Sequence, residues 1–98
     1  MGLVFVGDAG VYLPKRDAIR ITAIEGDRVV ECLLKASALA ALGCPQNASG
    51  EEMLRHFERH RDVIEIAAMV KYRRALTPMI EVDVTAADVA MVLPAVAA

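Results

Sequence analysis

The sequence contains no tryptophan, and aromatic residues make up only 4% of the chain. Its core must therefore be packed mainly from aliphatic side chains. The two cysteines, Cys32 and Cys44, stand in different sequence contexts and do not predict a disulfide framework, which favours a reduced, cytoplasmic setting. The sequence contains no run of about 18 apolar residues, which is the length needed to span a membrane. It also has no basic segment followed by an apolar one, so it does not predict a signal peptide.

Charge and hydrophobicity narrow the function classes further. The formal net charge of −2 argues against polyanion binding by bulk charge. Hydrophobic residues form 56% of the chain, whereas about 45–50% is usual for soluble domains. The 98 residues are enough for one domain, with an expected core at about 3–89 and a loose apolar tail at 90–98. The surplus of apolar residues favours self-association, most simply as a homodimer.

The longest helical pattern in the chain begins at Ser49 and extends to Leu76. Ser49 and Glu52 have the spacing of a capping box, in which each side chain accepts a hydrogen bond from the backbone N–H of the other residue. Residues 51–77 contain no glycine or proline, and Pro78 disfavours helix at the residue before it. The sequence therefore predicts one long, unbroken helix.

Alternation of apolar and polar residues predicts the strands. Ile19, Ile21 and Ala23 share one face of a strand, and Gly26 suits the hairpin turn that follows it. The other expected elements are strands at 3–6, 29–34 and 79–84, a loop at 7–10, a short helix at 36–42, and a last turn that begins at Thr85 and is limited by Pro94. This order predicts an α+β fold, with a small antiparallel sheet of three to four strands and one short and one long helix on one face.

Two side-chain groups could support metal or thiol chemistry. His56 and His60 lie four residues apart on the predicted helix, a spacing that can hold a metal ion, but no third ligand is evident. We therefore expect no metal and no cofactor, with His60 packed beneath the helix, one ring nitrogen bonded to backbone, and His56 exposed. Cys32 is expected to be a buried apolar residue, and Cys44 the more reactive thiol because it lies in a loop.

The end of the long helix is the most basic part of the chain. Lys71, Arg73 and Arg74 lie close together there and could contact phosphate groups. Nucleic-acid binding requires a patch of one charge sign, yet five acidic residues interleave with six basic ones along the whole helix. We therefore favour a solvated helix with internal ion pairs, such as Arg61–Glu65, and keep nucleic-acid binding as an alternative.

One long pattern and several short pieces occur in a characteristic order along the chain. The long pattern is Phe57-x-x-His60-Arg61-x-x-Ile64-x-x-x-Ala68-x-x-Lys71-Tyr72. The other pieces are Leu3-x-Phe5, Tyr12, Asp17-x-Ile19-x-Ile21, Cys32, Ala38-Leu39 and Thr85-x-x-Asp88. In this order, over about residues 3–89, they resemble a family of short bacterial proteins known as domain of unknown function 1488. The resemblance implies a small cytoplasmic α+β protein, and it implies no activity and no catalytic residues.

The chain departs from the family pattern in two places, and both departures bear on its expected structure. The polar residues of the pattern are candidates for function. Lys35 stands where such sequences often have Ser or Thr, so the short helix is expected to lack a side-chain cap. The tail after Val89 runs past the usual end of the family. His60, Arg61 and Tyr72 are the candidate functional residues.

The preferred hypothesis is a small non-enzymatic domain that acts by protein association, most simply as a homodimer. An unknown protein partner is the alternative to a second copy, and no membrane partner is expected. One alternative is a nucleic-acid-linked regulator that uses the basic helix end. The other is a metal- or thiol-dependent enzyme that uses His60 with Cys32 or His56. No phosphate-binding glycine motif or paired acid site favours a particular reaction.

Overall fold

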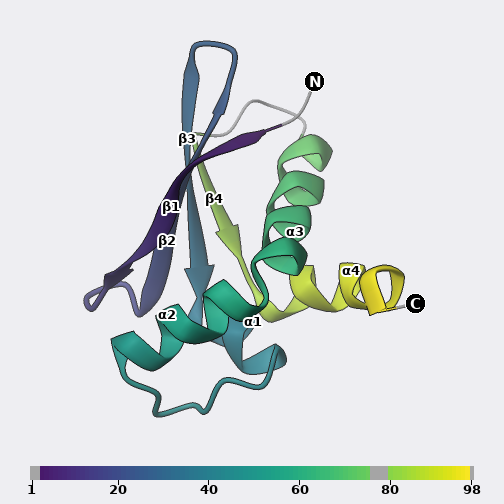
Figure 1. Ribbon diagram of the computed structural model, residues 1–98. Coiled ribbons are helices and arrows are strands. Elements are labelled where there is room, and N and C mark those ends of the chain that lie inside the picture. Colours follow the sequence, from purple (N-terminus) through teal and green to yellow (C-terminus); the bar gives the residue numbers. More distant parts are fainter. Residues whose placement is uncertain (1–2, 76–79, 98) are drawn as a thin grey trace.

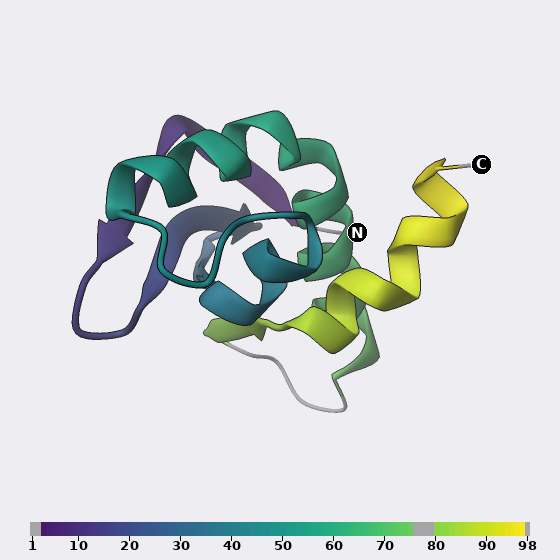
Figure 2. The same cartoon turned by 90° about the horizontal axis from the view of Figure 1, so that it is seen from below.

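The computed structural model describes residues 3–75 and 80–97. In these residues, helices pack against one face of a four-stranded sheet (Figures 1 and 2). The elements are β1 (Val4–Leu13), β2 (Ala18–Glu25), β3 (Arg28–Lys35), α1 (Ala36–Ala41), α2 (Gly50–Arg59), α3 (Arg61–Arg74), β4 (Glu81–Val84) and α4 (Ala86–Ala97). The helix end expected at Leu76 to Pro78 and the first residue of the last strand, Met79, lie outside the described residues.

The sheet is mixed. Its strand order is β1-β2-β3-β4, with antiparallel pairing from β1 to β3 and parallel pairing between β3 and β4. The α+β class is confirmed, whereas the expectation of purely antiparallel pairing is corrected at β4. The reason is topological: the chain crosses over through α1, α2 and α3, and so returns to the sheet in the same direction as β3 (Figure 1).

The segment predicted as one long helix forms two helices that meet at His60. His60 ends α2 and precedes α3 with backbone angles of φ −116° and ψ 26°, which lie outside the helical range. The break lets α2 pack against β1 while α3 packs against β4 and α4 (Figure 1). Phe57 and Ile64, on either side of it, are both fully buried. The structure therefore corrects the unbroken helix at one residue.

Strand β1 is longer than predicted because it includes the expected loop at 7–10. The pairing with β2 shifts between Val6 and Val11, as in a β-bulge. Gly7 in the bulge has a φ of +82°, which a residue with a Cβ adopts only at a cost. At Gly10, a Cβ would lie 2.5 Å from the Ile19 side chain and 3.3 Å from the Phe57 ring. The bulge thus lets β1 pass closely over the core.

Local capping agrees with the sequence in two places. Both hydrogen bonds of the Ser49–Glu52 capping box are present at the start of α2. Helix α1 has Lys35 at its N-cap and no side-chain cap, as predicted. Instead, the N–H of Ala36 donates to the carbonyl of Asp17 at 3.2 Å, which ties α1 to the turn between β1 and β2.

The core is aliphatic, as expected, and α4 completes it. Val89 and Val92 of α4 are buried in the same cluster as the inward-facing residues of the sheet. Residues 90–97 of the expected loose tail belong instead to α4, which passes through position 94 and ends at Ala97, while position 98 lies outside the described residues. Pro94 therefore does not limit the last turn as predicted.

Candidate functional site

The two histidines lie side by side at the junction of α2 and α3. Their rings stack at a centroid distance of 6.5 Å, and both residues are half-buried. The Nδ1 atom of His56 is buried without a hydrogen-bond partner among the described residues. The expectation that His56 is exposed is therefore wrong. Among the described residues, neither ring nitrogen of His60 bonds to a backbone group, so that expectation is wrong as well. Within residues 3–75 and 80–97, no three His, Cys, Asp or Glu side chains gather as metal ligands would.

Arg61 anchors this junction to the sheet. Its Nη2 donates to the carbonyl of Gly7 at 3.0 Å, and its Nε donates to Glu65 at 2.9 Å, which confirms the predicted ion pair. The guanidinium also lies 5.4 Å from the centre of the Phe57 ring, within the range of a cation–π contact. These contacts hold the first residue of α3 against the bulge of β1, and they give Arg61 a structural role.

Tyr72 joins α3 to the β2–β3 hairpin. Its hydroxyl donates to Glu25 Oε1 at 2.8 Å and accepts from Arg28 Nη1 at 3.3 Å. The side chain is only 8% exposed, so the ring packs in the core while its polar tip meets two charged groups near the turn. The structure does not bring Tyr72 together with His60 and Arg61, which lie at the opposite end of α3.

The basic end of α3 is largely engaged within the protein. Lys71 Nζ donates to the carbonyl of Asp83 and, at 3.0 Å, to the carboxylate of Asp88. Arg74 contacts Met91 Sδ at 3.7 Å, while Arg73 is exposed and makes no ion pair with the described residues. Lys71 thus stabilises the start of α4, and the three cations predicted for phosphate contact do not form one free patch.

The Asp88 carboxylate also caps α4. It accepts hydrogen bonds from the Thr85 N–H at 2.9 Å and from the Thr85 hydroxyl at 3.0 Å. Burial raises the pKa of Asp88, but the hydrogen bonds from Thr85 and Lys71 lower it by more, so the pKa lies below its ordinary value. The charged form of Asp88 is therefore the one that the fold stabilises.

Neither cysteine is an exposed thiol. Cys32 is fully buried on the inner face of β3, and burial together with the charge of Glu31 raises its pKa to about 12. Cys44 is buried as well, and burial followed by the charge of Glu52 raises its pKa. The prediction that Cys44 is reactive through exposure is therefore wrong, because the loop that carries it folds back onto the core. A thiol with a raised pKa is a poor nucleophile at neutral pH.

The clearest unexplained surface is the face of the sheet that points away from the helices. Val4 of β1, Ile24 of β2 and Val29 of β3 are paired neighbours across three strands, and Val4 and Val29 are 61% and 55% exposed. Val6 and Val11 extend this apolar row along β1, and both are exposed. We call these five residues the open-face patch: Val4, Val6, Val11, Ile24 and Val29.

Charged residues beside the open-face patch are paired within the chain. Arg20 lies 3.7 Å from Glu31, and Arg16 lies 3.1 Å from Glu81, in both cases between exposed side chains. Strand β1 is an edge of the sheet and, in the part of the chain that the structure describes, pairs only with β2. The patch therefore includes residues of an edge strand, β1, whose outer backbone N–H and C=O groups can form hydrogen bonds with another strand.

The fold and these surfaces define a small α+β domain with a mixed sheet. The chain belongs to the family described as "protein of unknown function (DUF1488)", whose sequence profile matches residues 4–79. It is similar to the crystal structure of a DUF1488-family protein of unknown function from Shewanella loihica PV-4. The TM-score is 0.67 at 23% identity, over 82% of this chain and 90% of that chain. No curated protein matches the chain.

Sequence reasoning missed the open-face patch because the N-terminal run was interpreted only as a short apolar strand. The signal was present, since Val4 and Val6 alternate with Leu3 and Phe5 and must point to the opposite face. The alternation alone does not indicate that the helices cover only one face of the sheet.

No helix among the described residues is long and apolar enough to cross a membrane.

Proposed function

We propose that this protein is a non-enzymatic association domain that forms a homodimer through β1 and the open-face patch. The observation that carries the proposal is a row of exposed valines on an edge strand, in a chain with a higher share of hydrophobic residues than is usual for soluble domains. Contiguous exposed apolar residues with a polar surround are typical of interaction sites.

A second copy is the occupant that fits this surface best. Two β1 strands that pair antiparallel about a twofold axis would place each open-face patch beside its own symmetry mate, as an isologous interface requires. The neighbouring charges are already paired as Arg20–Glu31 and Arg16–Glu81. A second copy of the chain would therefore meet little electrostatic repulsion at this surface. Edge pairing would also satisfy backbone groups that β1 leaves open to solvent.

Light scattering over a range of concentrations tests the proposal. We expect a dimer mass for the wild type. The double variant V4K/V6K, with both changes on β1, should weaken the dimer by about 100-fold or more, because it places four like charges in one small interface. Both positions are exposed, so circular dichroism should show an unchanged fold.

The matched control is I66K, which adds a lysine at a 38% exposed isoleucine on α3, among the helices. It should leave the dimer intact. A wild type that stays monomeric at the highest concentration would overturn the proposal, and so would a dimer that V4K/V6K leaves unchanged.

A further inference from the structure

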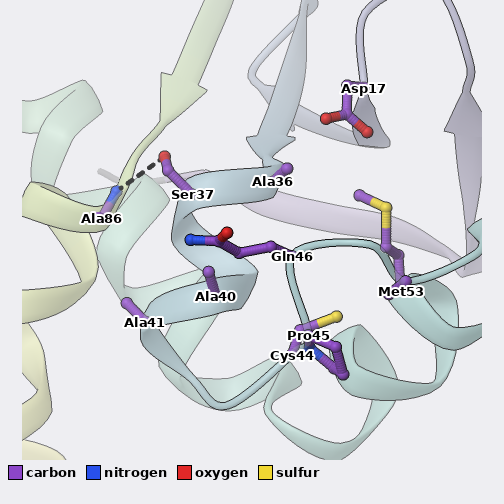
Figure 3. A pocket seen from close by; sticks show the side chains of 11 residues that line it. Asp17, Ala36, Ser37, Ala40, Ala41, Cys44, Pro45, Gln46, Met53 and Ala86 are labelled. Atoms are coloured by element: carbon purple, nitrogen blue, oxygen red, sulfur yellow. Dashed lines mark hydrogen bonds between the residues drawn. The ribbon is translucent and has the colours of Figure 1, made fainter.

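A pocket of about 500 Å³ lies on the helical side of the protein, between α1, the segment that follows it, and the start of α2 (Figure 3). This volume falls within the usual range for small-molecule sites. Met53 and Cys44 form buried parts of its wall, and Pro45 and Gln46 are exposed parts. Most of the remaining lining consists of methyl side chains, from Ala36, Ala40, Ala41, Ala48 and Ala86.

One carboxylate faces this apolar surface. Asp17, in the turn between β1 and β2, lies at the pocket with its side chain turned towards Ala36 and Met53 (Figure 3). The side chain is exposed and makes no hydrogen bond or ion pair with the described residues. The neighbouring polar groups are the Gln46 amide and the Ser37 hydroxyl, which accepts from the Ala86 N–H at 3.4 Å.

The backbone of Asp17 is held in a conformation that most residues avoid. Its φ is +46°, in the left-handed region, where aspartate and asparagine are tolerated better than most other residues. The Asp17 N–H donates to the carbonyl of Pro14 at 3.3 Å, and its carbonyl accepts from the Ala36 N–H at 3.2 Å. Both sides of the peptide chain are thus fixed, which keeps the Cα of Asp17 beside the pocket. Strain of this kind is often found at binding sites.

We propose that this pocket binds a small amphipathic amine, with its ammonium group at Asp17 and a short aliphatic body against the alanine methyls and Met53. An alkyl chain suits a wall of methyl groups because its affinity comes from apolar surface removed from water. The ammonium group supplies the positively charged partner that the Asp17 carboxylate lacks among the described residues. The Gln46 amide and the Ser37 hydroxyl can bond a further polar substituent on the ligand. This site is separate from the open-face patch.

The test is a ¹H–¹⁵N NMR titration of the full chain with hexylamine, compared with hexanol and hexanoate. Hexylamine should shift the amides of Asp17, Ala36 and Ala40 in a saturable way. Hexylammonium should bind more tightly than hexanol, and hexanoate more weakly than either. Affinity within an alkylamine series should rise about fourfold per added methylene until the pocket is full.

Variants separate the charge from the cavity. D17N keeps a side chain that tolerates the left-handed backbone, and it should lower hexylamine affinity about tenfold while hexanol affinity stays unchanged. D27N, in the exposed β2–β3 turn, is the matched control and should change neither. A40L fills the pocket from an exposed helix position and should abolish saturable binding of both ligands.

Three results would overturn the proposal. The first is hexylamine shifts that never saturate or that spread over the whole surface. The second is equal hexylamine affinity in D17N and the wild type. The third is unchanged binding in A40L when its spectrum shows a folded protein.

Discussion

Replacing Tyr72 with phenylalanine removes one hydroxyl from the contact between α3 and the β2–β3 hairpin. The hydroxyl donates to the Glu25 carboxylate at 2.8 Å, and hydrogen bonds to charged groups contribute about 1.5–3 kcal/mol. Partial exposure of Glu25 reduces this value, and the bond from exposed Arg28 is long at 3.3 Å and adds little. Because the ring stays buried, we expect Y72F to lose about 1–2 kcal/mol of unfolding free energy.

Urea and thermal denaturation measure this loss. For a domain of this size, 1 kcal/mol corresponds to about 4–8 °C in Tm. The matched control is Y12F, because the Tyr12 hydroxyl has no hydrogen-bond partner among the described residues. It should change stability by less than about 0.5 kcal/mol. A double-mutant cycle with E25Q should show coupling of about 1 kcal/mol. Equal stability of Y72F and Y12F, or a cycle without coupling, would refute the assigned role of Tyr72.

Two further predictions concern the helix junction and the start of α4. R61A should lose about 1–2 kcal/mol, because it removes the anchor to β1 and a cation–π contact, whereas R59A, at an exposed neighbour, should stay within about 0.5 kcal/mol of the wild type. Urea denaturation of both variants checks this, and equal losses would contradict it. The pKa of Asp88 lies below its ordinary value of 3.8 in the folded state, so its contribution is present at neutral pH and is lost as the pH falls through the lowered pKa. D88N should therefore be less stable than the wild type at pH 7, with a difference that shrinks below about pH 3.8, and a constant difference down to pH 2 would disprove this assignment.

Local signals in the sequence predicted local structure well. The Ser49–Glu52 spacing specified its capping box, because both hydrogen bonds form within one turn. The alternation around Ile21 predicted which face of β2 is buried, since period-two alternation follows directly from strand geometry. The missing cap at Lys35 was also predictable, because a lysine side chain has no acceptor for a backbone N–H.

Features set by tertiary contacts could not be predicted in the same way. The break at His60 involves no glycine or proline; it is held by Arg61, which reaches a carbonyl far away in the sequence. The burial of Cys44 depends on how its loop folds back onto the core. The pocket near Asp17 is lined by scattered alanines, which carry no pattern of their own.

The parallel pairing of β4 has a consequence for how the chain folds. Strands β1, β2 and β3 are neighbours in both sequence and sheet, so this meander can assemble from short-range contacts. Strands β3 and β4 are separated in sequence by three helices, although they are neighbours in the sheet. Closing that long connection costs conformational entropy before the contacts between the two strands compensate for it. We therefore expect β4 and α4 to dock last, so that Val89 and Val92 seal a core that the rest of the chain has already formed.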